Sequence, residues 1–228
     1  MQTIAYIDAF NLYFGALKPA NCKWLNLEIW LDAQFPRNQI ISIKYFTARV
    51  KPFEGDSSSC VRQEAYLDAL STLSRVEIIE GHYLVNQTTA MLATPPPNGV
   101  SRYVQIIKSE EKQSDVNIAS HLLLDACRGN CKAAIVVSGD GDLSTPIRMA
   151  TQEFQMPVIV LNPQSRSSYH LEQVATAYRG THYRWNPKTQ RRVRTRNDGI
   201  RQNLLTNSQF PDPVALPNNS VIAKPDGW

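Results

Sequence analysis

The run AAIVV at residues 133–137, followed at once by SGDGDL, constrains the fold more than any other feature of the sequence. Five successive apolar residues leave no polar face, which is typical of a strand buried on both sides in a parallel sheet. Other apolar or β-branched stretches predict further strands, and amphipathic stretches with helical spacing alternate with them. The strands are predicted at 3–8, 40–50, 76–84 and 158–161, and the helices at 11–17, 27–35, 60–73, 114–128, 143–154 and 168–178. This alternation predicts an α/β domain with a mostly parallel central sheet.

Two stretches depart from this alternation. TPPPNG at residues 94–99 cannot continue a helix or a strand ladder, because its three prolines lack the backbone donor. We therefore expect a hairpin formed by 85–93 and 103–107. The pattern stops after Trp185, so we assign residues 1–185 to the domain and residues 186–228 to a basic, proline-containing, flexible tail, with 207–228 disordered.

The charge of the chain is unevenly distributed. Eight Lys and Arg side chains and one acid lie between Arg179 and Arg201, and the rest of the chain has a net charge of −3 within the total of +4. An arginine-rich segment attached to an acidic protein is typical of one that contacts a polyanion. Guanidinium groups also bind phosphate in a bidentate way, although a solubilising tail would have a similar composition. The predicted RNA-binding residues are Arg191, Arg192, Arg194 and Arg196.

The composition excludes several classes of protein. A hydrophobic content of 43% with 19% charged residues describes an ordinary soluble domain. No run approaches the roughly eighteen apolar residues of a membrane span, and the first residues do not form a secretion signal. The four cysteines are too few for a disulfide framework, and CRGNC at 127–131 lacks a second pair of zinc ligands. We expect a cytoplasmic protein with no membrane partner, and formation of a homo-oligomer stays open.

Four aspartates end predicted strands or open a predicted helix. Asp8 ends the first strand, and Asp115 opens a helix whose N-cap would be Ser114. Asp140 and Asp142 follow the buried strand. Because ligands of parallel α/β sheets bind beyond the carboxyl ends of the strands, these side chains could converge. Carboxylates held close together raise one another's pKa, and a bound Mg²⁺ or Mn²⁺ would relieve that repulsion and activate water for attack on a phosphodiester.

Each aspartate also has an ordinary structural explanation. Asp8 and Asp142 suit turns or helix N-caps, and Asp115 suits the first turn of a helix, where the helix dipole favours negative charge. Asp140 is harder to explain in this way, because it stops a fully apolar strand. Asp125 lies roughly 80° around the predicted helix from Asp115, so we assign it to the solvated surface.

Six segments, in order, resemble the successive blocks of one family. They are YIDAFNLYFGAL (6–17), KYFTARV (44–50), RQEAYLDAL (62–70), EGHY (80–83), EKQSDVNIASHLLLDA (111–126) and VVSGDGDLSTPIRMA (136–150). With them, residues 1–180 resemble the NYN domain, a branch of the PIN-like nucleases, and in particular its LabA-like bacterial members. The resemblance implies a three-layer α/β/α sandwich and a metal-dependent endoribonuclease that acts on single-stranded or structured RNA. The positions it implies for holding Mg²⁺ or Mn²⁺ are Asp8, Asp115, Asp140 and Asp142.

Other positions also match the family pattern. Asn11 matches the polar residue that follows the first aspartate, and Ser138 matches a small residue that could hold a water on the metal. Lys112, three residues before Asp115, is the best-placed cation for a phosphate contact. The chain departs from the family's common residues at Ala9, Gln113 and Gly141, and none of these differences removes a carboxylate.

Other functions fit parts of the sequence. A haloacid-dehalogenase-type phosphatase also ends its first strand with an aspartate, but its chemistry needs a second aspartate where Phe10 stands. An NYN-like module that binds RNA or a protein without cleaving it would carry the same four carboxylates. Three tyrosines fit a base-stacking groove, although core packing explains them better: Tyr13, Tyr45 and Tyr83.

Overall fold

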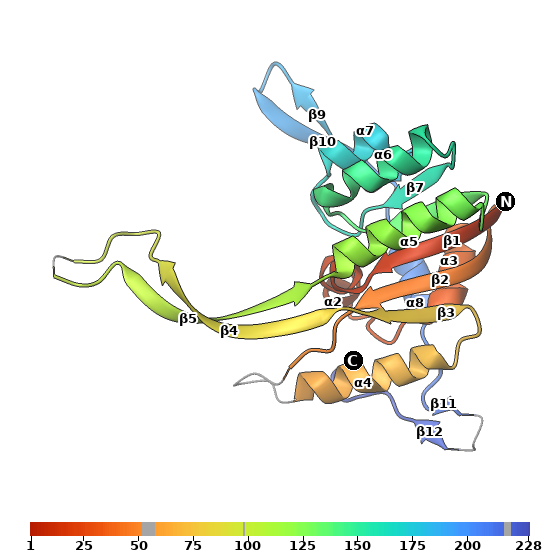
Figure 1. The fold of residues 1–228 in the computed structure, drawn as a ribbon, viewed down its shortest axis with the longest axis horizontal. Coiled ribbons are helices and arrows are strands. Elements are labelled where there is room, and N and C mark those ends of the chain that lie inside the picture. Colours follow the sequence, from red (N-terminus) through yellow and green to blue (C-terminus); the bar gives the residue numbers. More distant parts are fainter. Residues whose placement is uncertain (52–57, 98, 217–219) are drawn as a thin grey trace.

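A six-stranded parallel sheet forms the centre of the molecule (Figure 1). The computed structural model describes residues 1–51, 58–97, 99–216 and 220–228, without the side chains of 183–185, 192 and 195–197. The strands, in spatial order, are β3 (Val76–Glu80), β2 (Gln39–Thr47), β1 (Gln2–Asp8), β6 (Ala133–Val137), β7 (Val158–Leu161) and β8 (Ala177–Arg179). Each neighbouring pair is parallel, which confirms the predicted sheet.

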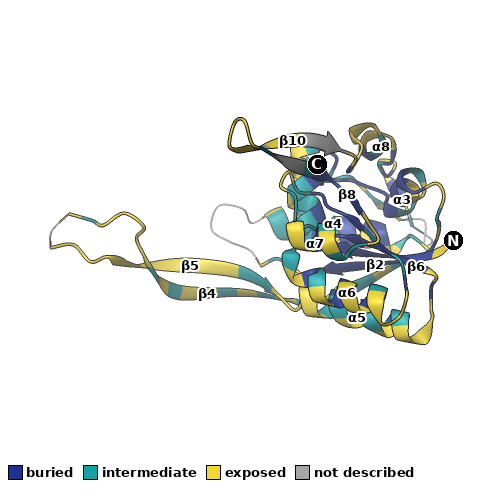
Figure 2. Cartoon of the chain, turned by 90° about the horizontal axis from the view of Figure 1, so that it is seen from above, coloured by how far each residue is buried: buried dark blue, intermediate teal, exposed yellow. Residues whose placement is uncertain are grey.

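Helices cover both faces of the sheet (Figure 2). One face carries α1 (Ala9–Leu12), the π-helix η1 (Tyr13–Leu17), α2 (Lys18–Ala20), α3 (Leu27–Gln34), α4 (Ser58–Ser71) and α8 (Gln202–Asn207). The other carries α5 (Ser114–Arg128), the 3-10 turn η2 (Gly141–Leu143), α6 (Ser144–Gln152) and α7 (Tyr169–Val174). Because successive side chains of a strand point to opposite faces, Ala5 and Ile7 enter one core and Ile4 and Tyr6 the other. The predicted three-layer α/β/α sandwich is confirmed.

The order of the strands reverses between β1 and β6. From β1 the chain crosses outward to β2 and then β3, and from β6 it crosses in the opposite direction to β7 and β8. The connections on the two sides therefore diverge at this point, and open α/β sheets bind their ligands in the crevice that forms there, beyond the carboxyl ends of the strands, here β1 and β6. Asp8 and Ser138 stand at those two ends.

A long hairpin projects from the body in both views of the molecule (Figures 1 and 2). It consists of β4 (His82–Met91) and β5 (Tyr103–Lys112), paired antiparallel along their whole length. The predicted hairpin is confirmed, but the single strand expected at 76–84 is wrong, because Gly81 separates β3 in the sheet from β4 in the arm. The arm rejoins the body at α5, next to the crevice.

Some predicted details of the helices are wrong. Gln113, not Ser114, precedes α5 as its N-cap, in a left-handed conformation with φ 80° that joins the arm directly to the helix. Val116 and Val61 are apolar residues of two predicted amphipathic helices, 114–128 and 60–73, and would be expected in the core, but they are 65% and 66% exposed. Ile118 is buried in place of Val116, because the face of α5 that packs on the sheet runs through Ile118, Leu122 and Asp125.

The expectation that the end of the chain is a flexible, partly disordered tail is also wrong. Residues 181–186 and 191–197 form the hairpin of β9 (Thr181–Asn186) and β10 (Arg191–Asn197), and β11 (Val214–Ala215) pairs with β12 (Val221–Ile222). Phe210 is 6% exposed, and its amide donates to the carbonyl of Trp24 at 2.8 Å. Leu205 and Val214 join the same core. These three apolar side chains fix the segment on the face of the sheet that carries α3, although other apolar residues of the segment, such as Val193 and Val221, are exposed.

Within the described ranges, none of the helices combines the length and the hydropathy that crossing a membrane requires.

Candidate active site

Asp8 is the centre of a hydrogen-bonded network at the end of β1. It is 4% exposed and caps α1, accepting from the Asn11 backbone amide at 2.9 Å. The other carboxylate oxygen accepts from Asn11 Nδ2 at 2.9 Å and from Ser138 Oγ at 3.1 Å. Asp8 therefore caps a helix, which was one of its two predicted roles. The same hydrogen bonds hold its carboxylate in one orientation.

The SGDGD segment turns around Ser138. The amide of Asp140 donates to Ser138 Oγ at 3.1 Å, and Asp140 in turn accepts from the amide of Asp142 at 2.9 Å. Asp140 is half-buried at the start of η2, whereas Asp142 is exposed. Ser138 thus couples Asp8 to Asp140 through one hydroxyl group.

Gln164 belongs to this network and was missed by the sequence analysis. Its Nε2 donates to Asn11 Oδ1 at 3.0 Å, and the same oxygen accepts from the amide of Gly139 at 3.1 Å. Gln164 follows β7, so its position after the carboxyl end of a parallel strand was the available signal.

Gly139 is needed for close packing, whereas Gly141 is not. A Cβ on Gly139 would overlap Asn162 Oδ1, an atom held by the amide of Gln164 at 2.8 Å. A Cβ on Gly141 would have ordinary contacts with Ser168, at 3.7 Å. We expect Gly139→Ala to lower the free energy of unfolding by about 1–3 kcal/mol and Gly141→Ala to change it by less than about 0.5 kcal/mol. Urea unfolding of both variants measures the difference, and equal stability of the two would contradict this packing.

Asp115 and Glu111 complete an acidic cluster. Desolvation by the surrounding protein and the charges of Asp140, Asp8 and Asp142 raise the pKa of Asp115 to about 6, even though the residue keeps contact with solvent. Burial and the charges of Asp8 and Asp115 raise the pKa of Glu111, at the end of β5, to about 8. The sequence analysis missed Glu111, since only the arm geometry turns it toward the crevice.

Burial also raises the pKa of Asp8, and the charge of Asp140 adds to that rise. The hydrogen bonds from Asn11 and Ser138 act in the opposite direction, because they favour the charged carboxylate. The four predicted aspartates and Glu111 therefore influence one another electrostatically, and their mutual repulsion is the structural basis for considering a cation.

The donor set suits a hard cation such as Mg²⁺ or Mn²⁺, which takes carboxylate oxygens and water. Glu111 Oε1 is buried beside the cluster with no hydrogen-bond partner among the described residues, and so is Ser114 Oγ. Among the residues that the structure describes, no three His, Cys, Asp or Glu side chains lie together closely enough to form a ready-made metal site. An ion here would therefore contact one or two carboxylates directly and the others through water.

The raised pKa values give a stability prediction. A carboxyl group with a higher pKa in the folded state contributes stability below its unfolded pKa, and this contribution is lost as the pH rises through the folded value. We expect the metal-free protein to lose melting temperature between about pH 4 and pH 8, the window set by Asp115 and Glu111. Mg²⁺ at about a hundred times its Kd should restore about 2.7 kcal/mol at pH 8. Thermal unfolding in EDTA and in Mg²⁺ measures both effects.

Asp140→Asn is the matched variant, because asparagine keeps the cap of η2 and removes one charge. Its metal-free form should melt higher than the wild type at pH 8 and respond less to Mg²⁺. A melting temperature that is independent of pH, metal and this substitution would mean that the carboxylates do not repel one another.

The predicted cations lie outside the cluster. Lys112 forms an ion pair with Glu110 at 3.0 Å at the base of the arm, and its side chain is exposed. Arg191 and Arg194 are exposed on β10, and the side chains of Arg192 and Arg196 lie outside the described part. Since β9 begins directly after β8 ends, this hairpin leaves the sheet from the same carboxyl edge as the acidic cluster.

The assignment of Asp125 to the solvated surface is wrong. Asp125 is 4% exposed, because α5 turns it toward the sheet. It accepts from Lys44 Nζ at 2.6 Å, Tyr6 Oη at 2.7 Å and Asn130 Nδ2 at 2.8 Å. Burial opposes ionisation of Asp125, but the hydrogen bonds from Lys44, Asn130 and Tyr6 hold its pKa below the usual range. Asp125 and Lys44 therefore form a buried structural ion pair between α5 and β2.

The chain is similar to a curated protein and to two solved structures. The chain is 27% identical over 253 residues to 6-hydroxy-3-succinoylpyridine 3-monooxygenase of Pseudomonas putida, covering 100% of this chain and 75% of the relative. A crystal structure of a protein of unknown function from Vibrio parahaemolyticus matches 78% of this chain and 90% of its own, with 16% identity and a TM-score of 0.49. MurG of Acinetobacter baumannii matches 78% of this chain and 41% of its own, with 11% identity and a TM-score of 0.34.

The family comparison matches residues 6–179 to the NYN domain. This range runs from β1 to the end of β8 and contains every residue of the acidic cluster. Since the match spans most of the chain, the protein belongs to the NYN domain family.

Proposed function

We propose that this protein is a divalent-metal-dependent nuclease that cleaves RNA internally, with Mg²⁺ or Mn²⁺ bound in the crevice between β1 and β6. The observation that supports it is the acidic cluster at the point where the strand order reverses, where burial and, after it, the neighbouring carboxylates raise the pKa values of Asp8 and Asp115. Asp8 and Asp140 would hold the ion, and Asp115 and Asp142 would contact it through water. The proposed substrate is single-stranded or structured RNA, and the proposed location is the cytoplasm.

The bound ion would polarise the phosphodiester and activate a water molecule. Hydrogen bonds within the protein orient the carboxylates that would hold the ion. Three hydrogen bonds fix the carboxylate of Asp8, and Ser138 links that carboxylate to the backbone amide of Asp140. The carboxylate of Asp140 is held separately, by the amide of Asp142. Glu111, with a pKa of about 8, holds a proton near neutral pH in the absence of an ion. Gln164 holds Asn11, and through Asn11 it positions Asp8.

A cleavage assay tests this proposal. Purified protein is incubated with end-labelled RNA and with DNA of the same sequence, in Mg²⁺, in Mn²⁺ and in EDTA. We expect RNA fragments with both metals and none in EDTA. Binding of RNA that persists in EDTA, with no cleavage under any condition, would instead indicate an NYN-like module that binds without cutting.

Arg191 and Arg194 are proposed to capture RNA at the edge of the crevice. Deleting the chain after Trp185 cannot test this, because it would remove Leu205 and Phe210 from the core. Replacing both arginines by glutamine should lower the slope of log K against log salt by about 1.4, since each phosphate contact with a single strand contributes about 0.7. The matched control replaces Arg37 and Arg128, which are exposed at the amino edge of the sheet. An identical slope in the two double variants would mean that Arg191 and Arg194 do not contact RNA, and would favour the alternative that β10 only increases solubility.

A second candidate function is oxygenation of a small aromatic compound. It is favoured by the similarity to a relative named as a 3-monooxygenase, which extends over the whole of this chain, including the segment after the NYN match. The test is incubation with 6-hydroxy-3-succinoylpyridine, O₂ and a two-electron reductant, followed by chromatography. A hydroxylated product, with no RNA cleavage by the same preparation, would select this function over the nuclease.

A further inference from the structure

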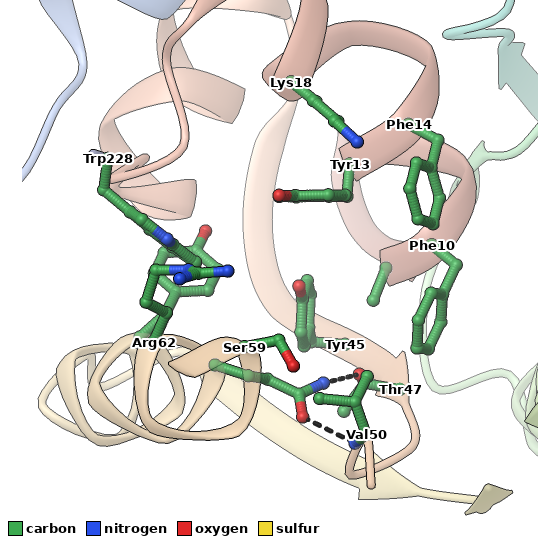
Figure 3. A pocket seen from close by; sticks show the side chains of 13 residues that line it. Phe10, Tyr13, Phe14, Lys18, Tyr45, Thr47, Val50, Ser59, Arg62 and Trp228 are labelled. Atoms are coloured by element: carbon green, nitrogen blue, oxygen red, sulfur yellow. Dashed lines mark hydrogen bonds between the residues drawn. The ribbon is translucent and has the colours of Figure 1, made fainter. Parts of the chain in front are cut away.

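An aromatic pocket opens beside α1, the helix that follows Asp8 (Figure 3). It has a volume of about 220 Å³ and opens between α1, η1, the end of β2 and α4. Its walls are mostly aromatic rings, namely Phe10, Tyr13, Phe14, Tyr45, Tyr66 and Trp228. Of the tyrosines considered for base stacking, Tyr13 and Tyr45 line this pocket, whereas Tyr83 stacks on the outer side of Phe10 at 6.2 Å between ring centroids.

The pocket is cationic although the neighbouring crevice is acidic. Lys18 and Arg62 line it from two different helices, and Lys18 Nζ lies 5.5 Å from the centroid of the Phe14 ring. None of the described residues that line it is an Asp or a Glu. A ligand here would therefore meet aromatic faces and positive charge together, which suits a planar ring that carries an anionic group.

Trp228 completes the aromatic wall of the pocket. Its indole lies 5.5 Å from the Tyr66 ring and 6.2 Å from the Trp24 ring, so the last residue of the sequence is held in the aromatic wall. Its Nε1 is buried and, among the described residues, has no acceptor. The part of Trp228 that the pocket uses is therefore its aromatic ring, as one wall for a planar ligand.

The pocket lies close to the proposed cleavage site. Phe10 is separated from Asp8 by one residue of α1, and Thr47 at the end of β2 lines the pocket. Tyr45, which forms the floor, is close enough to Asp8 for that charge to raise its pKa, after burial as the main cause. A chain of nucleotides with one phosphate at the acidic cluster would therefore extend directly into the pocket.

We propose that this pocket binds one nucleotide of the RNA substrate, with its base against the aromatic wall and its phosphate at Lys18 and Arg62. This proposal rests on the nuclease function, and it adds a reason for the RNA to bind at a site whose cluster is acidic. Stacking of a base on an aromatic side chain tolerates every base, since each has a π face. The subsite therefore positions RNA without selecting a sequence.

Binding of mononucleotides in EDTA tests the pocket without requiring cleavage. Isothermal titration compares AMP and UMP with ribose 5-phosphate, which lacks the ring, and with nicotinate, which is an aromatic acid but no nucleotide. We expect both nucleotides to bind and ribose 5-phosphate to bind at least tenfold more weakly. Phe10→Ala and Arg62→Gln should each weaken AMP binding by about 5- to 100-fold, the usual range for one stacking or phosphate contact. The matched controls are Phe154→Ala and Arg128→Gln, outside the pocket.

Each other outcome overturns the proposal in a recognisable way. Equal binding of AMP and ribose 5-phosphate would mean that the rings do not contribute. Tight binding of nicotinate with none of either nucleotide would assign the pocket to free aromatic acids. Unchanged AMP affinity in both pocket variants would place the nucleotide elsewhere. Normal AMP binding by a protein that cuts no RNA would leave the pocket standing and remove the nuclease, so the two proposals fail separately.

Discussion

Replacing Asp8 or Asp140 by asparagine lowers the rate of RNA cleavage at least a hundredfold in the proposed mechanism. Each substitution removes a negative ligand of the ion, and a hundredfold loss corresponds to about 2.7 kcal/mol of transition-state stabilisation. Asparagine can still accept the amide of Asn11 at position 8 and that of Asp142 at position 140, so both helix caps survive. Single-turnover cleavage of labelled RNA at saturating Mg²⁺ measures the loss.

Two controls make this result specific. Asp142→Asn should have a smaller effect, because Asp142 is exposed and its proposed contact with the ion is through water. Asp68→Asn changes an exposed aspartate on α4 and should leave the rate unchanged. Full activity of the Asp140 variant with a normal melting temperature would rule out the proposed metal-binding role of this residue.

Asp125→Ala is expected to cause the largest loss of stability, about 3–5 kcal/mol in the free energy of unfolding. The substitution leaves the ammonium group of Lys44 in a site where its side chain is only 12% exposed. It also removes the acceptor of Tyr6 and Asn130. Urea unfolding measures the effect, and the remaining folded protein should cleave RNA at the wild-type rate, because Asp125 lies outside the acidic cluster.

A double variant separates the contribution of the two charges to stability from the contribution of side-chain packing. Replacing Lys44 by methionine together with Asp125 by leucine removes both charges, and stability should return to within about 1–2 kcal/mol of the wild type. Asp68→Ala, on the surface of α4, should cost less than about 0.5 kcal/mol. A loss below about 1 kcal/mol in Asp125→Ala would mean that Lys44 finds another partner or reaches water.

The sequence predicted the sheet well because its strands are buried on both faces. AAIVV and the other apolar runs have no alternative location in a soluble α/β protein, and their carboxyl ends place Asp8, Ser138 and Asp140 near one another. The hairpin followed from the TPPPNG break. These features depend on the types of residues that are neighbours along the chain, so they can be predicted from a single sequence.

The residues that the sequence did not predict depend on distant packing. Asp125 is polar and looks solvated until Lys44 and Tyr6 of two different strands are brought against it. Glu111 reaches the cluster only because the arm ends beside α5. The segment after Trp185 has too few apolar residues to stand out, yet Phe210 fills a gap next to Trp24. None of these contacts has a periodicity that could be read along the chain.

The most direct test of the metal-dependent active site is to locate the ion. Crystals grown or soaked with Mn²⁺, measured at the manganese absorption edge, give an anomalous signal only where the metal is ordered. We expect the strongest peak in the crevice between β1 and β6, at coordination distance from the carboxylates of Asp8 and Asp140, and no such peak in crystals of Asp140→Asn. A well-ordered protein at saturating Mn²⁺ with no peak beside these carboxylates, or with its peak elsewhere on the surface, would contradict the account.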